Sequence, residues 1–146
     1  MRVAVTVGLS KLKTSISMVS TNNTRIMVVD DQYDIVHLLR RQLERKGYDV
    51  DTFTNPLYAL EIFRQNPTRY SLLITDISMP ELRGTVLARE LQKIRPEIKV
   101  VVMTAFDLNS QDFEFSLPAI KPTDILKKPI SLDQVVSVVK AHLESI

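Results

Sequence analysis

The sequence predicts an α/β fold with a five-stranded parallel sheet at its centre. From residue 25 onward, short apolar runs rich in β-branched residues alternate with longer segments in which apolar residues recur at helical spacing. The short runs are continuously apolar, which is typical of parallel strands covered on both faces. A chain of 146 residues, 45% apolar and 25% charged, has the size and composition of one compact domain.

The first half of this region predicts two strands and two helices, over residues 26–29, 33–46, 48–53 and 56–66. Gly47 can adopt the left-handed backbone conformation that ends the first helix. Asn55 and Pro56 provide an N-cap and a first-turn proline for the second helix. We expect the buried faces of the two helices to include Leu38 and Leu57, respectively.

The second half predicts three more strands and two more regular helices, over residues 72–75, 86–94, 100–103, 125–126 and 132–143. Ser131 and Gln134 form a capping box for the last helix. Residues 106–124 are the least regular, because Pro118 and Pro122 limit any helix there to a few turns. The prediction is therefore five strands and about five helices, with an irregular fourth helix region.

Polar side chains follow the predicted strands at their carboxyl ends. Asp30 and Asp31 follow the first strand, Asp76 the third, Thr104 the fourth and Lys128 the fifth. Ligands bind at this edge in open α/β sheets. If the first and third strands are neighbours, as in the doubly wound, flavodoxin-like order 2-1-3-4-5, three carboxylates converge. Such a cluster requires a cation, and oxygen ligands without imidazole or thiolate select Mg²⁺ or Mn²⁺.

Carboxylates beside one hydroxyl and one lysine are suited to hold a phosphoryl group. The metal neutralises one phosphoryl oxygen, while Thr104 and Lys128 can supply a hydrogen bond and a positive charge to the others. One carboxylate can itself be the nucleophile. Asp76 is the best candidate because it stands alone, which leaves the Asp30–Asp31 pair to hold the metal.

Four short motifs carry these residues. They are Met27-Val28-Val29-Asp30-Asp31, Leu73 to Pro80 with Gly84 beyond, Val102-Met103-Thr104-Ala105, and Lys127-Lys128-Pro129-Ile130. Together they resemble the receiver domain of two-component response regulators, and in particular the single-domain, chemotaxis-type proteins. The resemblance covers residues 25–146, so we expect a receiver domain over 24–146 and a flexible leader over 1–23.

The resemblance implies a role for each acidic residue. Asp76 is the expected phosphoacceptor, and Asp31, Asp76 and the Ser78 carbonyl are the expected ligands of Mg²⁺, with Mn²⁺ as a substitute. Asp30 is expected to assist the metal through water.

The resemblance also implies that Thr104 and Lys128 contact the phosphoryl group and that the Lys128–Pro129 peptide bond is cis. Members of the family usually carry an aromatic switch residue three positions before the lysine, where this chain has Ile125. The preceding segment, residues 117–122, also departs from the family pattern. Both departures concern the readout of the signal and leave the phosphorylation site intact.

The implied function is that of a stand-alone phosphoacceptor. A histidine kinase or a histidine phosphotransfer protein would phosphorylate Asp76, and the signal would pass to an unidentified downstream protein by binding or by phosphoryl relay. We expect a monomer or weak dimer that catalyses only its own phosphorylation and dephosphorylation. The alternatives are a haloacid-dehalogenase-type phosphohydrolase, which would need an acid where Ser78 stands, and a scaffold that works without phosphorylation.

Simpler interpretations exist for some of these residues. Asp30 and Asp31 could be an N-cap of the following helix rather than metal ligands. Lys127 is the neighbouring alternative to Lys128, although adjacency to proline favours the second. Asp51, in the acidic Asp-Val-Asp stretch at the start of the second strand, is expected to lie on a solvated face.

Composition narrows the remaining function classes. The chain has no cysteine, which excludes disulfides, a thiolate nucleophile and Cys-ligated metals. It has only two histidines, His37 and His142, which are too few for a His-rich metal site and argue against a hydrolytic triad. Both are expected at the surface. No apolar run could span a bilayer, and we expect a cytoplasmic protein without a membrane partner.

Charge is distributed unevenly along the chain. The overall charge of +2 reflects a basic N-terminal stretch, because the 15 basic and 17 acidic residues from Asp30 onward give −2. These later charges are interspersed and form no basic stripe, so we expect no nucleic-acid partner. A secretory signal is the alternative for the leader, but Lys11 and Lys13 interrupt its apolar run.

Overall fold

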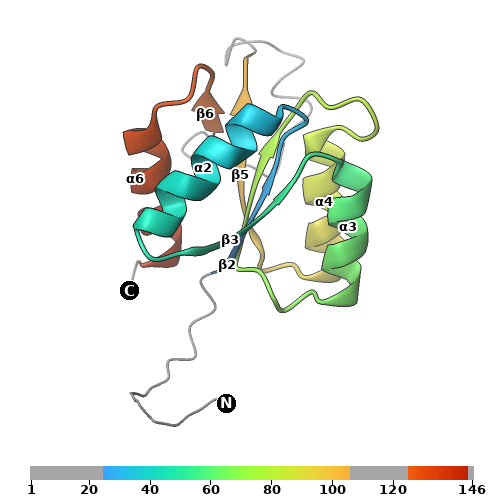
Figure 1. The fold of residues 1–146 in the computed structure, drawn as a ribbon. Helices are drawn as coiled ribbons and strands as arrows, with labels where there is room; N and C mark the ends of the chain where they lie inside the picture. The colour runs from blue at the N-terminus through green and yellow to red at the C-terminus, as the bar shows by residue number, and fades with distance from the viewer. Residues whose placement is uncertain (1–24, 106–124, 145–146) are drawn as a thin grey trace, which may run out of the picture.

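The computed structural model describes residues 25–105 and 125–144. They form three layers, with a parallel sheet between two pairs of helices (Figure 1). The predicted leader, residues 1–23, and the segment expected to hold an irregular helix, residues 106–124, lie outside the described residues.

The sheet has five parallel strands: β2 (Arg25–Val29), β3 (Asp49–Phe53), β4 (Leu72–Asp76), β5 (Lys99–Thr104) and β6 (Ile125–Lys127). Their spatial order is β3-β2-β4-β5-β6. This order confirms the predicted order 2-1-3-4-5. The strand ends differ by one residue from those predicted, so that Asp76 and Thr104 are the last residues of their strands.

The described ranges contain four helices: α2 (Tyr33–Arg45), α3 (Pro56–Gln65), α4 (Gly84–Ile94) and α6 (Leu132–Leu143). Predicted signals mark the end of α2 and the starts of α3 and α6, whereas α4 begins at Gly84, two residues before the predicted start at residue 86. Gly47 has a φ of +96°, the Asn55 side chain accepts a hydrogen bond from the amide of Leu57, and the Ser131 hydroxyl accepts one from the amide of Gln134. None of the described helices is long and apolar enough to cross a membrane.

Two apolar cores lie on the two faces of the sheet. Helices α2 and α6 cover one face, where Val36 and Val139 pack against the strands. Helices α3 and α4 cover the other face (Figure 1). On that face, Phe63 and Leu91 are fully buried. Because side chains on both faces of β2, β4 and β5 are buried, these strands read as continuous apolar runs.

The prediction that Leu38 and Leu57 belong to the core is wrong. Leu38 on α2 is 46% exposed and Leu57 on α3 is 49% exposed. Both residues lie at the edge of the apolar stripe of their helix, beyond the part that meets the sheet. Helical spacing indicates which side of a helix is apolar, but the width of the buried stripe is set by the neighbouring elements.

The interpretation of Asp51 as a solvated residue is also wrong. Its carboxylate is half-buried and receives the Arg25 guanidinium at 2.8 Å, the Tyr70 hydroxyl at 2.6 Å and the Arg69 guanidinium at 3.3 Å. These hydrogen bonds and charges outweigh the effect of burial, which would raise the pKa of Asp51, and they hold it below its usual value. The cluster joins strands β2 and β3 to the segment before β4.

Candidate functional site

The end of strand β2 places two carboxylates at the upper edge of the sheet. Asp30 is fully buried, and its backbone N–H donates to the Phe53 carbonyl of the neighbouring strand at 3.1 Å. Its carboxylate accepts a hydrogen bond from the amide of Gln32 at 2.9 Å. Gln32 is the N-cap residue of α2, so the interpretation of Asp30 and Asp31 as the N-cap is wrong. Asp31 is exposed.

The end of strand β4 places a third carboxylate beside them. Asp76 is buried, and the chain beyond it is held by the hydrogen bond from Ile77 N–H to the Met103 carbonyl at 3.1 Å. The first residue of α4, Gly84, passes directly over this turn, and its N–H donates to the Ile77 carbonyl at 2.8 Å. A Cβ atom on Gly84 would lie 1.8 Å from the Asp76 carbonyl oxygen, so only glycine fits there.

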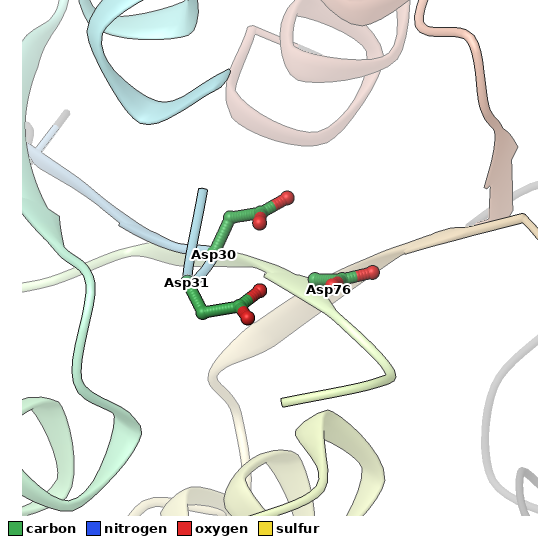
Figure 2. Close-up of side chains that lie close together, drawn as sticks. All are labelled: Asp30, Asp31 and Asp76. Carbon is green, nitrogen blue, oxygen red and sulfur yellow. The ribbon is translucent and has the colours of Figure 1, made fainter. Parts of the chain in front are cut away.

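The three acidic side chains form one cluster. Figure 2 shows Asp30 and Asp31, from the end of β2, next to Asp76 at the end of β4. One oxygen from each carboxylate lies within 4.8 Å of the other two. The neighbouring position of β2 and β4 produces this convergence, as the sequence predicts.

Lys128 reaches the cluster from the end of β6, the strand that lies beyond β5 in the sheet. Its Nζ lies 2.9 Å from Asp30 Oδ2 and 3.4 Å from Asp76 Oδ1. Its backbone N–H donates to the Thr104 carbonyl at 2.7 Å, which fixes the lysine at the end of β6. The Lys128–Pro129 peptide bond is cis, as expected.

Lys127 does not take this place. It is exposed, and its Nζ donates to the Ala105 carbonyl at 2.7 Å. The lysine that reaches the carboxylates is therefore Lys128, in agreement with the prediction from the adjacent proline.

The electrostatics of the site reflect an excess of negative charge. Burial raises the pKa of Asp76, and the charge of Asp30 raises it further, while Lys128 opposes both effects. Burial alone would lower the pKa of Lys128, but its hydrogen bond to Asp30 and the charges of Asp30 and Asp76 outweigh this effect and raise it. One ammonium group therefore compensates the carboxylates only in part.

The remaining predicted site residues lie around this cluster. Thr104 is buried at the end of β5, beside the strand that ends in Asp76. Ser78 is exposed in the turn after Asp76. Ile125, at the position where members of the family usually carry an aromatic residue, is half-buried and packs against the core under α3 and α4.

One residue of the site was not predicted. The Gln32 side chain does not cap α2, and its Oε1 accepts a hydrogen bond from Lys128 Nζ at 3.4 Å. Serine, threonine, aspartate and asparagine are the preferred N-cap residues. A glutamine at this position, directly after the acidic pair, was the available signal that its side chain serves another purpose.

The donor set fits a hard divalent cation. Three close carboxylates with a single ammonium group leave net negative charge, and no cysteine competes for the metal. Among the described residues, the ligands on offer here are oxygen atoms, which suit Mg²⁺ and Mn²⁺.

Comparison with known proteins identifies the family. The model of the response regulator receiver domain matches residues 26–140. The response regulator receiver protein CpdR of Brucella abortus is 34% identical over 119 residues, covering 82% of this chain and 96% of that protein. Sporulation initiation phosphotransferase F of Bacillus subtilis is 30% identical over 122 residues, covering 83% and 94%, respectively.

A solved structure agrees with this result. The response regulator TrrA of Thermotoga maritima, in complex with Mg²⁺-BeF, is 32% identical and superposes with a TM-score of 0.69, covering 82% of this chain and 99% of that chain. The fold, the sequence motifs and the family model therefore agree over the same part of the chain. The chain belongs to the response regulator receiver family of two-component signalling.

Proposed function

We propose that this receiver accepts a phosphoryl group on Asp76 from a histidine kinase or a histidine phosphotransfer protein. The single observation that carries the proposal is the placement of Asp76, whose buried carboxylate lies beside Asp30 and Asp31 and 3.4 Å from the Lys128 ammonium. A carboxylate in this environment can act as a nucleophile toward phosphorus, and the Lys128 ammonium can stabilise the negative charge of the transferring group.

The proposed transfer forms one bond and breaks one. An oxygen of the Asp76 carboxylate bonds to phosphorus, and the bond from phosphorus to the imidazole nitrogen or acyl oxygen of the donor breaks. The donor leaves with the electron pair of that bond. Lys128 and the Thr104 hydroxyl are proposed to contact the phosphoryl oxygens. Thr104 ends β5, the strand next to β4, and Lys128 follows β6, the strand beyond β5.

The proposed metal ligands are Asp30, Asp31, Asp76 and the Ser78 carbonyl, with Asp30 acting through water. When bound, Mg²⁺ would neutralise part of the charge on the transferring phosphoryl group. Asp30 has a second role, since its hydrogen bond from Gln32 and its ion pair with Lys128 hold that lysine over Asp76.

The proposed output is binding to a downstream protein or transfer of the phosphoryl group to another histidine. The chain is proposed to act without an attached effector domain and as a monomer or weak dimer. CpdR and phosphotransferase F are matched over nearly their whole length, which supports the stand-alone form.

Incubation with acetyl phosphate and Mg²⁺ tests the proposal. Phosphate-affinity electrophoresis should show one retarded species, and chelation of the metal with EDTA should abolish it. Asp76→Asn should remove the species. Asp49→Asn is the matched control, because Asp49 lies at the opposite end of the sheet with a side chain 68% exposed, and it should leave the species intact. Retardation that persists in Asp76→Asn would overturn the proposal.

A further inference from the structure

A cavity opens beside the acidic cluster on its exposed side. It has a volume of about 410 Å³ and is lined by Asp31, Ser78, Met79, Pro80 and Arg83. The lining includes two of the proposed metal-binding residues, Asp31 and Ser78, and Arg83 contributes a positive charge. We call this space the Arg83 cavity.

The position of Arg83 is fixed by its neighbour. Gly84 contacts the backbone of Asp76 so closely that no Cβ fits between them. Arg83, the N-cap residue of α4, is therefore held next to the turn that carries the phosphoacceptor. Its backbone carbonyl accepts the amides of Val86 and Leu87, which ties it to the first turn of the helix.

Arg83 has no charge partner among the residues that the structure describes. Within residues 25–105 and 125–144, its guanidinium forms no ion pair and no hydrogen bond, and Glu81, two positions earlier in the same turn, does not pair with it. Lys128, in contrast, is largely buried and engaged with Asp30 and Asp76.

An incoming phosphodonor meets an electrostatic problem at this site. Asp30, Asp31 and Asp76 repel a phosphoryl dianion, and the ammonium of Lys128 already serves two of them. An unpaired cation at the entrance of a charged site attracts anions and raises their association rate, with an effect that salt weakens.

We propose that the Arg83 cavity is the entrance through which the phosphoryl dianion of a donor reaches Asp76, and that Arg83 attracts it. This inference rests on the proposed function and adds a residue that determines the rate with anionic donors. Arg83 lies at the rim of the site and takes no part in bond formation. The same phosphoryl chemistry is offered by a small acyl phosphate and by a protein phosphohistidine.

Charge reversal at Arg83 tests the inference. At saturating Mg²⁺ and low ionic strength, Arg83→Glu should lower the second-order rate of Asp76 phosphorylation by acetyl phosphate about three- to tenfold. The loss should shrink in high salt, and Arg83→Lys should restore most of the rate. Arg89→Glu is the matched control, since Arg89 is exposed on the same helix outside the cavity and the change in net charge is identical.

Three further measurements test whether the effect of Arg83 is electrostatic and whether it extends to a protein donor. Phosphoramidate, a donor of lower negative charge, should be affected less than acetyl phosphate by Arg83→Glu. The affinity for beryllofluoride, an anionic analogue of the phosphoryl group, should fall in Arg83→Glu and stay unchanged in Arg89→Glu. A phosphorylated histidine phosphotransfer protein can replace acetyl phosphate as the donor. If its phosphohistidine also enters through the Arg83 cavity, the variants should have the same order of phosphorylation rates as with acetyl phosphate.

Contrary results distinguish the two proposals. If wild-type protein is phosphorylated on Asp76 and Arg83→Glu reacts as fast as Arg89→Glu, the cavity inference is overturned and the proposed function stands. A rate loss in Arg83→Glu that salt does not change would also overturn it, because the effect would not be electrostatic. Absence of wild-type phosphorylation would overturn both.

Discussion

Lys128 connects the acidic residues of the site more than any other side chain. Its ammonium group has three protons and three acceptors, on Asp30, Asp76 and Gln32. Asp30 is fully buried, so the lysine is the partner that makes its charge tolerable in the interior. Each contact is made through the same nitrogen, and the loss of that nitrogen affects all three residues at once.

Replacement of Lys128 by methionine should destabilise the protein in the absence of metal. Methionine keeps the apolar stem but leaves the buried Asp30 carboxylate uncompensated, which we expect to lower the free energy of unfolding by about 1–3 kcal/mol. Added Mg²⁺ should recover part of this loss, because it supplies positive charge to the same carboxylates. Urea unfolding with and without Mg²⁺ measures both effects.

Lys127→Met provides the control for this prediction. Lys127 carries the same charge one position earlier, but it is exposed and hydrogen-bonds a backbone carbonyl. We expect a change within about 0.5 kcal/mol. Equal losses in the two variants would show that the ion pair of Lys128 does not stabilise the site.

The first turn of α4 determines the position of the phosphoacceptor at the scale of elements. Gly84 allows α4 to begin directly against the Asp76 backbone, and the hydrogen bond from its N–H to Ile77 locks the turn between them. Strands β4 and β5 hold the other side of this turn through the bond from Ile77 to Met103. Asp76 is thereby placed by two elements rather than by a mobile loop.

Gly84→Ala should therefore disturb both stability and the site. The added Cβ would meet the Asp76 carbonyl oxygen at 1.8 Å and the Thr75 hydroxyl at 2.9 Å, so the backbone has to move. We expect a loss of about 2–4 kcal/mol in unfolding free energy and a weaker affinity for Mg²⁺. Chemical denaturation and isothermal titration calorimetry measure the two quantities.

Gly47→Ala is the control for Gly84→Ala. It introduces backbone strain at a position away from the site and should not displace Asp76. Gly47 also disfavours a side chain because of its φ of +96°, but nothing lies within 4 Å of its Cβ position. This variant should lose about 1–2 kcal/mol and keep its Mg²⁺ affinity. If Gly84→Ala also kept its Mg²⁺ affinity, α4 would not position Asp76.

At the scale of the whole molecule, the sequence predicted the features that follow from the burial of the strands and from their parallel arrangement. Strands covered on both faces must be continuously apolar, so β2, β4 and β5 were visible as such. Parallel strands end at one edge, so the acidic residues and Lys128 could be expected to meet there.

Features that depend on the distance between neighbouring elements were not visible in the sequence. The exposure of Leu38 and Leu57 depends on how much of each helix surface packs against neighbouring elements. The ion pairs of Asp51 depend on side chains from segments that are distant in the sequence. The contact between Gln32 and Lys128 joins residues 96 positions apart and has no local pattern.

Removal of residues 1–23 should leave the domain intact. The two apolar cores of the described residues lie between Ile26 and Leu143 and cover both faces of the sheet. We expect the truncated protein, residues 24–146, to melt within about 2 °C of the full chain. Differential scanning calorimetry makes the comparison, and a loss of more than about 5 °C would show that the deleted residues contribute to the packed domain.

Chemical trapping of the phosphorylated residue tests the central claim most directly. Sodium borohydride reduces an aspartyl phosphate to homoserine, which peptide mass spectrometry can locate in the chain. After reaction with acetyl phosphate and Mg²⁺, we predict homoserine at position 76 and unchanged aspartate at positions 30 and 31. Homoserine at either of those positions, or at none of the three in a protein that has taken up phosphate, would contradict the assignment of Asp76 as the phosphoacceptor.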